Sequence, residues 1–151
     1  MLINKILVAT DFSESANAAV KYAIKLAKET QASLTLLHSY QTLPYTESVG
    51  LVSFEPRLHE SLRSSAKAAL LEAQGEATGS GLSQVEIAVE QGAPFDAITH
   101  FAKEGHYDLI VVGTHGRTGI RHALLGSVAE RVVRHAHCPV LVVRILEEPT
   151  K

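Results

Sequence analysis

The sequence predicts an α/β fold, an open sheet of five parallel strands with helices on both faces. Short apolar runs alternate along the chain with longer segments whose apolar residues recur every three or four positions. Two runs, in KILVAT and DLIVVG, are continuously apolar, which is typical of strands buried on both faces. The chain of 151 residues has the size of one domain. We expect residues 1–146 to form it, followed by a short tail at 147–151.

The first half of the chain is expected to hold two strands, two helices and a long loop. Ile6–Ala9 and Leu34–Leu37 are the strands, and residues 39–56 are the loop, because they show no clean period and could hold only a short helix. The first helix has the apolar stripe Ala19, Tyr22, Ala23, Leu26 and Ala27. The second has Leu58, Leu62, Ala66, Ala69 and Ala73, and ends in the stretch Gly75, Gly79, Ser80 and Gly81.

The second half is expected to hold three strands and two helices. Residues 85–89 alternate, which indicates a strand with one wetter face near an edge of the sheet. Pro94 suits the first position of a helix that Gly105 ends, with the stripe Ile98, Phe101 and Ala102. Asp108–Gly113 and Val140–Val143 are the last two strands. The helix between them has the stripe Leu125, Val128, Ala129, Val132, Val133 and Ala136.

Composition excludes several classes of protein. Hydrophobic residues make up 46% and aromatic residues 5%, which predicts an aliphatic core and not a disordered chain. The net charge of −2 disfavours bulk electrostatic binding to DNA or to an anionic membrane. Cys138 is the one cysteine, so no intramolecular disulfide forms. No apolar run is long enough for a signal peptide or a membrane span, and we expect a cytoplasmic protein.

The segment after the fourth strand is the strongest functional signal. Gly113 ends that strand, where a missing side chain would let a ligand lie close to the backbone. Gly116 and Gly119 permit positive φ and a concave run of amides that favours anions. Gly126 and Ser127 then open a helix whose first amides have no partner within the helix. We expect Ser127 to be its N-cap, in a capping box with Glu130.

Charge in this segment supports an anionic ligand. No Asp or Glu occurs between Leu109 and Ala129, whereas His115, Arg117, Arg121 and His122 do. Arg117 is the better phosphate candidate of the two arginines, because a guanidinium pairs with two phosphate oxygens at once. The alternative is an ordinary surface loop whose glycines serve only as turns.

Other chemistries have little support. The sequence lacks G-x-x-x-x-G-K-[ST], G-x-S-x-G and H-E-x-x-H, and no G-x-G-x-x-G follows the first strand. His135-Ala136-His137-Cys138 lacks the second ligand cluster that a zinc site needs, and His38 suits a satisfied core position. Asp11 lacks the acidic neighbour of a phosphoacceptor; it, or Ser13, is also a candidate cap of the first helix.

The spacing Gly113-x2-Gly116-x9-Gly126-Ser127 resembles the G-2x-G-9x-G-[ST] signature of ATP-binding universal stress proteins. The likeness covers nearly the whole chain, including KILVATDFSESA, LLHSY, DLIVVGTHGR, LLGSVAERV and CPVLVV. It implies a Rossmann-like fold, of the adenine nucleotide alpha hydrolase type, with strand order 3-2-1-4-5 and a nucleotide across the carboxyl ends of the first and fourth strands.

The resemblance also implies roles for particular residues. Residues at the ribose and phosphates would be Gly113, Gly116, Arg117, Gly126 and Ser127, with Thr114 and His115 in the same loop. Val112 and Val128 would flank the site, and Asp11 would contact the nucleoside. The backbone of Ala9, Thr10 and Ser39 would border adenine. Some members have Pro at the position of Ala9 and many have Val at that of Ser39, but these contacts are mainly through backbone.

The expected function is an ATP-binding or adenine-nucleotide-binding stress-response switch, active as a homodimer. Residues Val140, Leu141, Val142 and Val143 would pair with a second copy if they form an edge strand, as in similar family members. ATP or AMP is the expected ligand, with Mg²⁺ as an optional companion of ATP. Two alternatives stay open: a slow ATP hydrolase or phosphotransferase, with His115 orienting water, and a nucleotide-independent structural or chaperone-like dimer.

Overall fold

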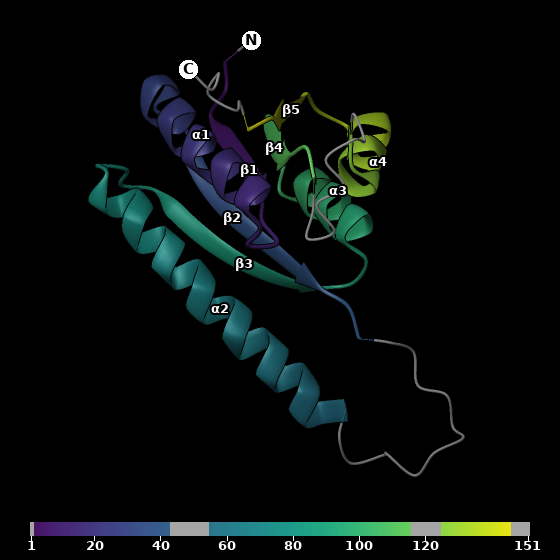
Figure 1. The fold of residues 1–151 in the computed structure, drawn as a ribbon. Coiled ribbons are helices and arrows are strands. Elements are labelled where there is room, and N and C mark those ends of the chain that lie inside the picture. Colours follow the sequence, from purple (N-terminus) through teal and green to yellow (C-terminus); the bar gives the residue numbers. More distant parts are fainter. Residues whose placement is uncertain (1, 43–54, 116–124, 146–151) are drawn as a thin grey trace, which may run out of the picture.

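The computed structural model describes residues 2–42, 55–115 and 125–145 (Figure 1). Its elements are β1 (Lys5–Ala9), α1 (Glu14–Thr30), β2 (Ser33–Tyr40), α2 (Glu55–Gly79), β3 (Val85–Gln91), α3 (Pro94–Glu104), β4 (Leu109–Gly113), α4 (Ser127–His135) and β5 (Val140–Val143). All nine elements that the sequence predicts are present. The predicted loop at 39–56 is too long at both ends, because residues 39–40 belong to β2 and residues 55–56 to α2. Residues 43–54, the tail from 146, and the segment with Gly116, Arg117, Gly119, Arg121 and His122 lie outside the described residues.

All strand pairs are parallel, and the order is β3-β2-β1-β4-β5, which confirms the predicted topology. The winding reverses at the central pair, since β1 leads to β2 on one side and β4 lies on the other. In an open sheet of this kind, ligands bind at the carboxyl ends of the strands where the winding reverses. β3 and β5 are the two edges of the sheet, and the edge position of β3 agrees with its predicted alternation.

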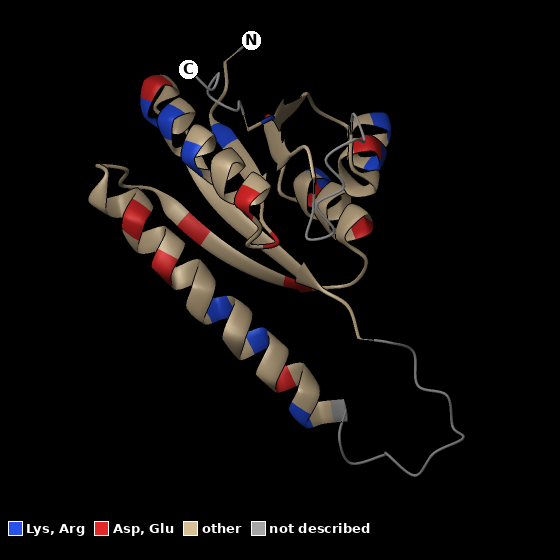
Figure 2. Cartoon of the chain, in the orientation of Figure 1, with Lys and Arg blue, Asp and Glu red and all other residues tan. Residues whose placement is uncertain are grey.

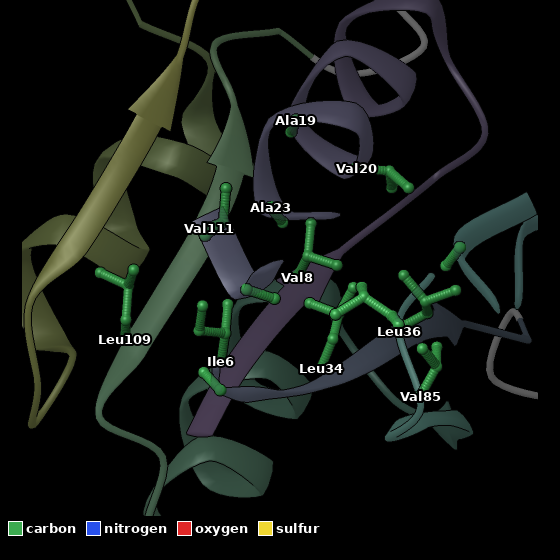
Figure 3. Close-up of a cluster of buried hydrophobic side chains, with 14 of the residues drawn as sticks. Ile6, Val8, Ala19, Val20, Ala23, Leu34, Leu36, Val85, Leu109 and Val111 are labelled. Carbon is green, nitrogen blue, oxygen red and sulfur yellow. The ribbon is translucent and has the colours of Figure 1, made fainter. Parts of the chain in front are cut away.

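Two apolar cores cover the two faces of the sheet. On one face, α1 and α2 pack over a cluster that includes Ile6, Val8, Leu34, Leu36 and Val111 (Figure 3). On the other face, α3 and α4 pack over a second cluster: Leu7, Leu37, Ile98, Ala102, Tyr107, Ile110, Val112, Ala129 and Val132. Consecutive strand residues therefore alternate between cores, and the sheet is buried on both sides.

Charged residues are unevenly distributed among the strands. Figure 2 shows the ribbons of β2 and β4 free of charged residues, whereas the edge strand β3 carries Glu86 and Glu90. Charged residues on an edge strand discourage pairing with another chain. Within the described part of the chain, none of the helices has the length and apolar character needed to cross a membrane.

Helix α2 differs from its prediction. Leu58, placed in the predicted apolar stripe, is half exposed, whereas Leu70 and Ala77 are fully buried. Gly75 lies inside the helix, which ends only at Gly79. The core-facing side is therefore shifted toward the C-terminal half of the helix, where α2 packs on β2 and β3.

The helix caps give one confirmation and one correction. Ser13 caps α1, and its side chain accepts a hydrogen bond from the amide of Ala16 at 3.2 Å. The capping box predicted for α4 is wrong: the N-cap is Gly126, and Glu130 instead pairs with Arg134 at 2.8 Å. The Gly126 amide donates to the Thr114 carbonyl at 2.7 Å, which starts the helix one residue earlier than predicted.

Candidate functional site

A cavity of about 590 Å³ lies at the carboxyl ends of the strands, within the size range of small-molecule sites. Every predicted nucleotide-binding residue that the structure describes lines it: Ala9, Thr10, Asp11, Ser39, Val112, Gly113, Thr114, His115, Gly126, Ser127 and Val128. These residues come from four separate stretches of the chain, and the fold brings them together. The predicted contacts Gly116 and Arg117 lie outside the described residues.

The turn between β1 and α1 is built from local hydrogen bonds. The Phe12 amide donates to Thr10 Oγ1 at 3.0 Å, and the Ser13 amide donates to Asp11 Oδ1 at 3.0 Å. Phe12 has a φ of 63°, in the left-handed region. This turn lets the chain leave the sheet and places Asp11 at the cavity wall.

Ser39 presents a hydrogen-bond donor and an acceptor to the cavity. The amide and carbonyl of Ser39 point toward the β1 side of β2. The last residue pair of β1 and β2 is Ala9 with Leu37, so Ser39 lies beyond the end of this pairing. The Thr10 amide adds one more bond, to the Leu37 carbonyl at 2.9 Å. Among the described residues, no partner takes the amide or the carbonyl of Ser39. A planar ligand with a matching acceptor and donor could therefore pair with this residue.

The predicted nest at Gly116 and Gly119 lies outside the described residues, but three described amides of the flanking loop are engaged. The amide of Thr114 donates to Val143 at 3.1 Å, that of His115 to Ser15 Oγ at 3.2 Å, and that of Gly126 to Thr114 at 2.7 Å. These three amides are therefore satisfied inside the protein. In the first turn of α4, the amides of Ser127, Val128 and Ala129 have no acceptor among the described residues. A helix N-terminus with open amides favours an anion.

Gly113 has a packing role in addition to the ligand contact that the sequence predicts. A β-carbon there would lie 2.6 Å from Ser15 Oγ and 2.7 Å from the Ser15 carbonyl oxygen. The close packing of α1 on β4 thus requires glycine at this position, independently of any ligand.

Sequence reasoning missed part of the cavity wall. Residues of α2 that it assigned to the core, or passed over, line the cavity, namely Leu62, Ser65, Ala66 and Ala69. Phe12, His38, Tyr40, Gln41, Pro94 and Ile98 line it too. The apolar stripe of α2 was visible in the sequence, but only the packing angle of the helix decides which of its residues face a cavity.

A metal centre has no support within the described ranges. No group of three His, Cys, Asp or Glu side chains there could hold a metal ion. Burial, with a contribution from the charge of Asp108, raises the pKa of the Cys138 thiol, which disfavours the thiolate that binds metals. His115 Nδ1 lies 3.0 Å from Thr114 Oγ1, and His38 is buried with its ring nitrogen hydrogen-bonded, as predicted.

Comparison with known proteins agrees with the fold. Residues 3–144 match the model of the Universal stress protein family. The chain is 38% identical over 143 residues to Universal stress protein MJ0531 of Methanocaldococcus jannaschii, covering 95% of this chain and 83% of that protein. It is 36% identical over 148 residues to Universal stress protein YxiE of Bacillus subtilis, covering 95% of this chain and all of that protein.

Solved structures give the same result. Universal stress protein UspA from Lactobacillus plantarum superposes with a TM-score of 0.84 at 30% identity, over 95% of this chain and 99% of that one. A universal stress protein in complex with cAMP gives 0.71 at 32% identity, over 95% and 98%. One from Archaeoglobus fulgidus in complex with dAMP gives 0.63 at 25% identity, over 94% and 98%. This chain belongs to the universal stress protein family.

Proposed function

We propose that this protein binds an adenine nucleotide at the cavity and acts as a nucleotide-loaded switch. One observation carries the proposal: the open amide and carbonyl of Ser39 complement the N1 acceptor and N6 amino donor of adenine. Hypoxanthine and guanine present the opposite pattern, a carbonyl oxygen and an N1–H donor. The site is therefore expected to select adenine.

The remaining cavity wall fits the rest of a nucleotide. Val112 and Val128 offer apolar surface beside the base, and Asp11 offers a carboxylate to ribose hydroxyls. The open amides at the start of α4 suit the phosphates, and Ser127 adds a hydroxyl. Similar family members bind cAMP and dAMP, which supports an adenine ligand without fixing its phosphate number.

We propose further that the switch acts as a homodimer through β5. This strand is an edge of the sheet, and its four residues are only half buried in one copy of the chain. Self-pairing about a two-fold axis would cover its open backbone groups. Thr114 lines the cavity and donates a hydrogen bond to Val143 of β5. Nucleotide binding next to Thr114 would therefore affect the dimer interface.

Calorimetric titration with ATP, AMP and ITP tests the binding proposal. We expect the two adenine nucleotides to bind and ITP to bind at least about tenfold more weakly, because it leaves both groups of Ser39 unpaired. Mass analysis of small molecules released on denaturation identifies any nucleotide that co-purifies. Equal binding of ATP and ITP, or of neither, would refute the adenine site.

A phosphate-release assay and a measurement of oligomeric state, run beside the titration, separate the alternatives that the sequence leaves open. Phosphate release that is faster than background and is lost in His115→Ala would favour a hydrolase. A dimer that binds no nucleotide would favour a structural role.

A further inference from the structure

The pattern of bonds along β2 shows what the next two bonds of the sheet would be. The amides of Ser33 and Thr10 bond across the β1–β2 pair, to Asn4 at 2.9 Å and to Leu37 at 2.9 Å. The backbone amides and carbonyls of odd-numbered residues of β2 thus point toward β1, and those of even-numbered residues point toward β3. Continuing the parallel pattern, the Ser39 amide would donate to the Thr10 carbonyl, and the Phe12 amide would donate to the Ser39 carbonyl.

Two side-chain contacts divert both of these bonds. His38 Nδ1 lies 2.8 Å from the Thr10 carbonyl oxygen and must donate to it, because a carbonyl oxygen only accepts. Thr10 Oγ1 accepts from the Phe12 amide at 3.0 Å. The Phe12 amide and one lone pair of the Thr10 carbonyl oxygen are therefore engaged, and neither group bonds to Ser39.

Packing holds this arrangement in place. The Phe12 ring stacks on the His38 ring, with centroids 4.6 Å apart and planes at 29°. His38 and Thr10 are both buried, so their donor and acceptor would be costly to leave unpaired. The positive φ of Phe12 turns the chain away from β2 at this point.

We propose that His38 and Thr10 are positioning residues that keep the amide and carbonyl of Ser39 open for the nucleotide base. Neither side chain needs to touch the base for this role. The inference rests on the proposed function for its ligand, but its structural part concerns the protein without ligand.

Backbone amide exchange of the unliganded protein, followed by NMR, tests the structural part. His38→Leu removes the donor, so the Thr10 carbonyl becomes available and the Ser39 amide should gain protection of about threefold or more. His38→Asn is the matched control, because its side-chain amide can replace Nδ1–H, and it should exchange as the wild type does. A Ser39 amide that is already protected in the wild type, or unchanged in His38→Leu, overturns the proposal.

A second pair of variants guards against a misfolded His38→Leu. Thr10→Val removes the acceptor of the Phe12 amide, whereas Thr10→Ser keeps it. We expect the Phe12 amide to bond to the Ser39 carbonyl in Thr10→Val, which gives a scalar coupling across that hydrogen bond, and to keep its bond to residue 10 in Thr10→Ser. The absence of this coupling in Thr10→Val, or its presence in Thr10→Ser, counts against the proposal.

Base selectivity then tests the functional part. His38→Leu should weaken ATP binding by about threefold to tenfold and bring the ratio of ATP to ITP affinity toward one, with His38→Asn restoring the ratio. A merely structural role would lower both affinities together and leave the ratio unchanged. If the wild type binds no nucleotide, the proposed function fails, while the amide exchange result stands on its own.

Discussion

A β-carbon on Gly113, at the end of β4, would stand 2.7 Å from the carbonyl oxygen of Ser15 in α1. The conflict is with backbone, which cannot move aside without shifting the helix. We therefore predict that Gly113→Ala lowers the free energy of unfolding by about 1–3 kcal/mol, measured by urea denaturation. The matched control is Gly75→Ala in α2, where a β-carbon meets nothing within 4 Å, and which should stabilise the protein by about 1 kcal/mol. Unchanged stability in Gly113→Ala would show that helix packing does not require this glycine.

Ser127→Asp is predicted to move stability and binding in opposite directions. A carboxylate in the first turn of α4 meets the open amides and should stabilise the helix by about 0.3–1 kcal/mol. The same charge faces the expected phosphates and should weaken ATP binding by about tenfold or more, measured by calorimetry. Ser127→Ala, which adds no charge, is the control. ATP affinity that survives the aspartate would place the phosphates elsewhere.

Tyr107 is predicted to control stability at alkaline pH. Its hydroxyl donates to Thr35 Oγ1 at 2.8 Å, and burial raises its pKa above the ordinary value of 10.0, with a smaller contribution from Glu86. The unfolded chain therefore loses this proton first, so the stabilisation is complete below pH 10.0 and is lost as pH rises through the higher folded pKa.

Tyr107→Phe isolates this effect. It should cost about 1 kcal/mol near neutral pH, because it removes the donor to Thr35, and it should flatten the alkaline decline. Urea denaturation of both proteins from about pH 8 to about pH 11 measures the difference. Parallel curves for the two proteins would mean that other groups cause the decline.

Val142→Pro is predicted to convert the proposed dimer to a monomer. The amides of Ile110 and Thr114 donate to the carbonyls of Pro139 and Val143. The backbone groups of odd-numbered residues in β5 therefore point toward β4, and the Val142 amide points away from the sheet. Proline at this position removes an outward donor and leaves the pairing with β4 intact. Light scattering after size-exclusion chromatography measures the mass, with Val142→Ala as the control that keeps the amide. A dimeric proline variant would exclude pairing through β5.

The order of elements could be predicted because apolar runs and helical stripes are local signals. Pro94 begins α3 and Ser13 caps α1, as their chemistry favours. The start of α4 was wrong because the bond from Gly126 to Thr114 is a tertiary contact, invisible in the pattern Ser127 to Glu130. The packing role of Gly113 was missed for the same reason, since its neighbour Ser15 is far away in sequence.

The candidate site also has a part that the sequence predicts and a part that it does not. The fold gathers the described residues of the glycine motif, Asp11 and Ser39 as predicted. The open backbone of Ser39 could not be predicted, because it depends on a histidine and a threonine that occupy its natural partners. The wall formed by α2 depends on how a long helix crosses the sheet, which no stripe of residues specifies.

That wall has a practical meaning for re-engineering. The α2 members of the core cluster, Leu70, Ala73 and Ala77, all follow the cavity-lining residues Leu62, Ser65, Ala66 and Ala69 along the helix. The residues of α2 that pack into the core are thus separate from those that line the cavity. Larger or smaller side chains at positions 65 and 69 would reshape the chamber with little effect on the anchor, so this helix is the natural starting point for a sensor tuned to an unnatural ligand.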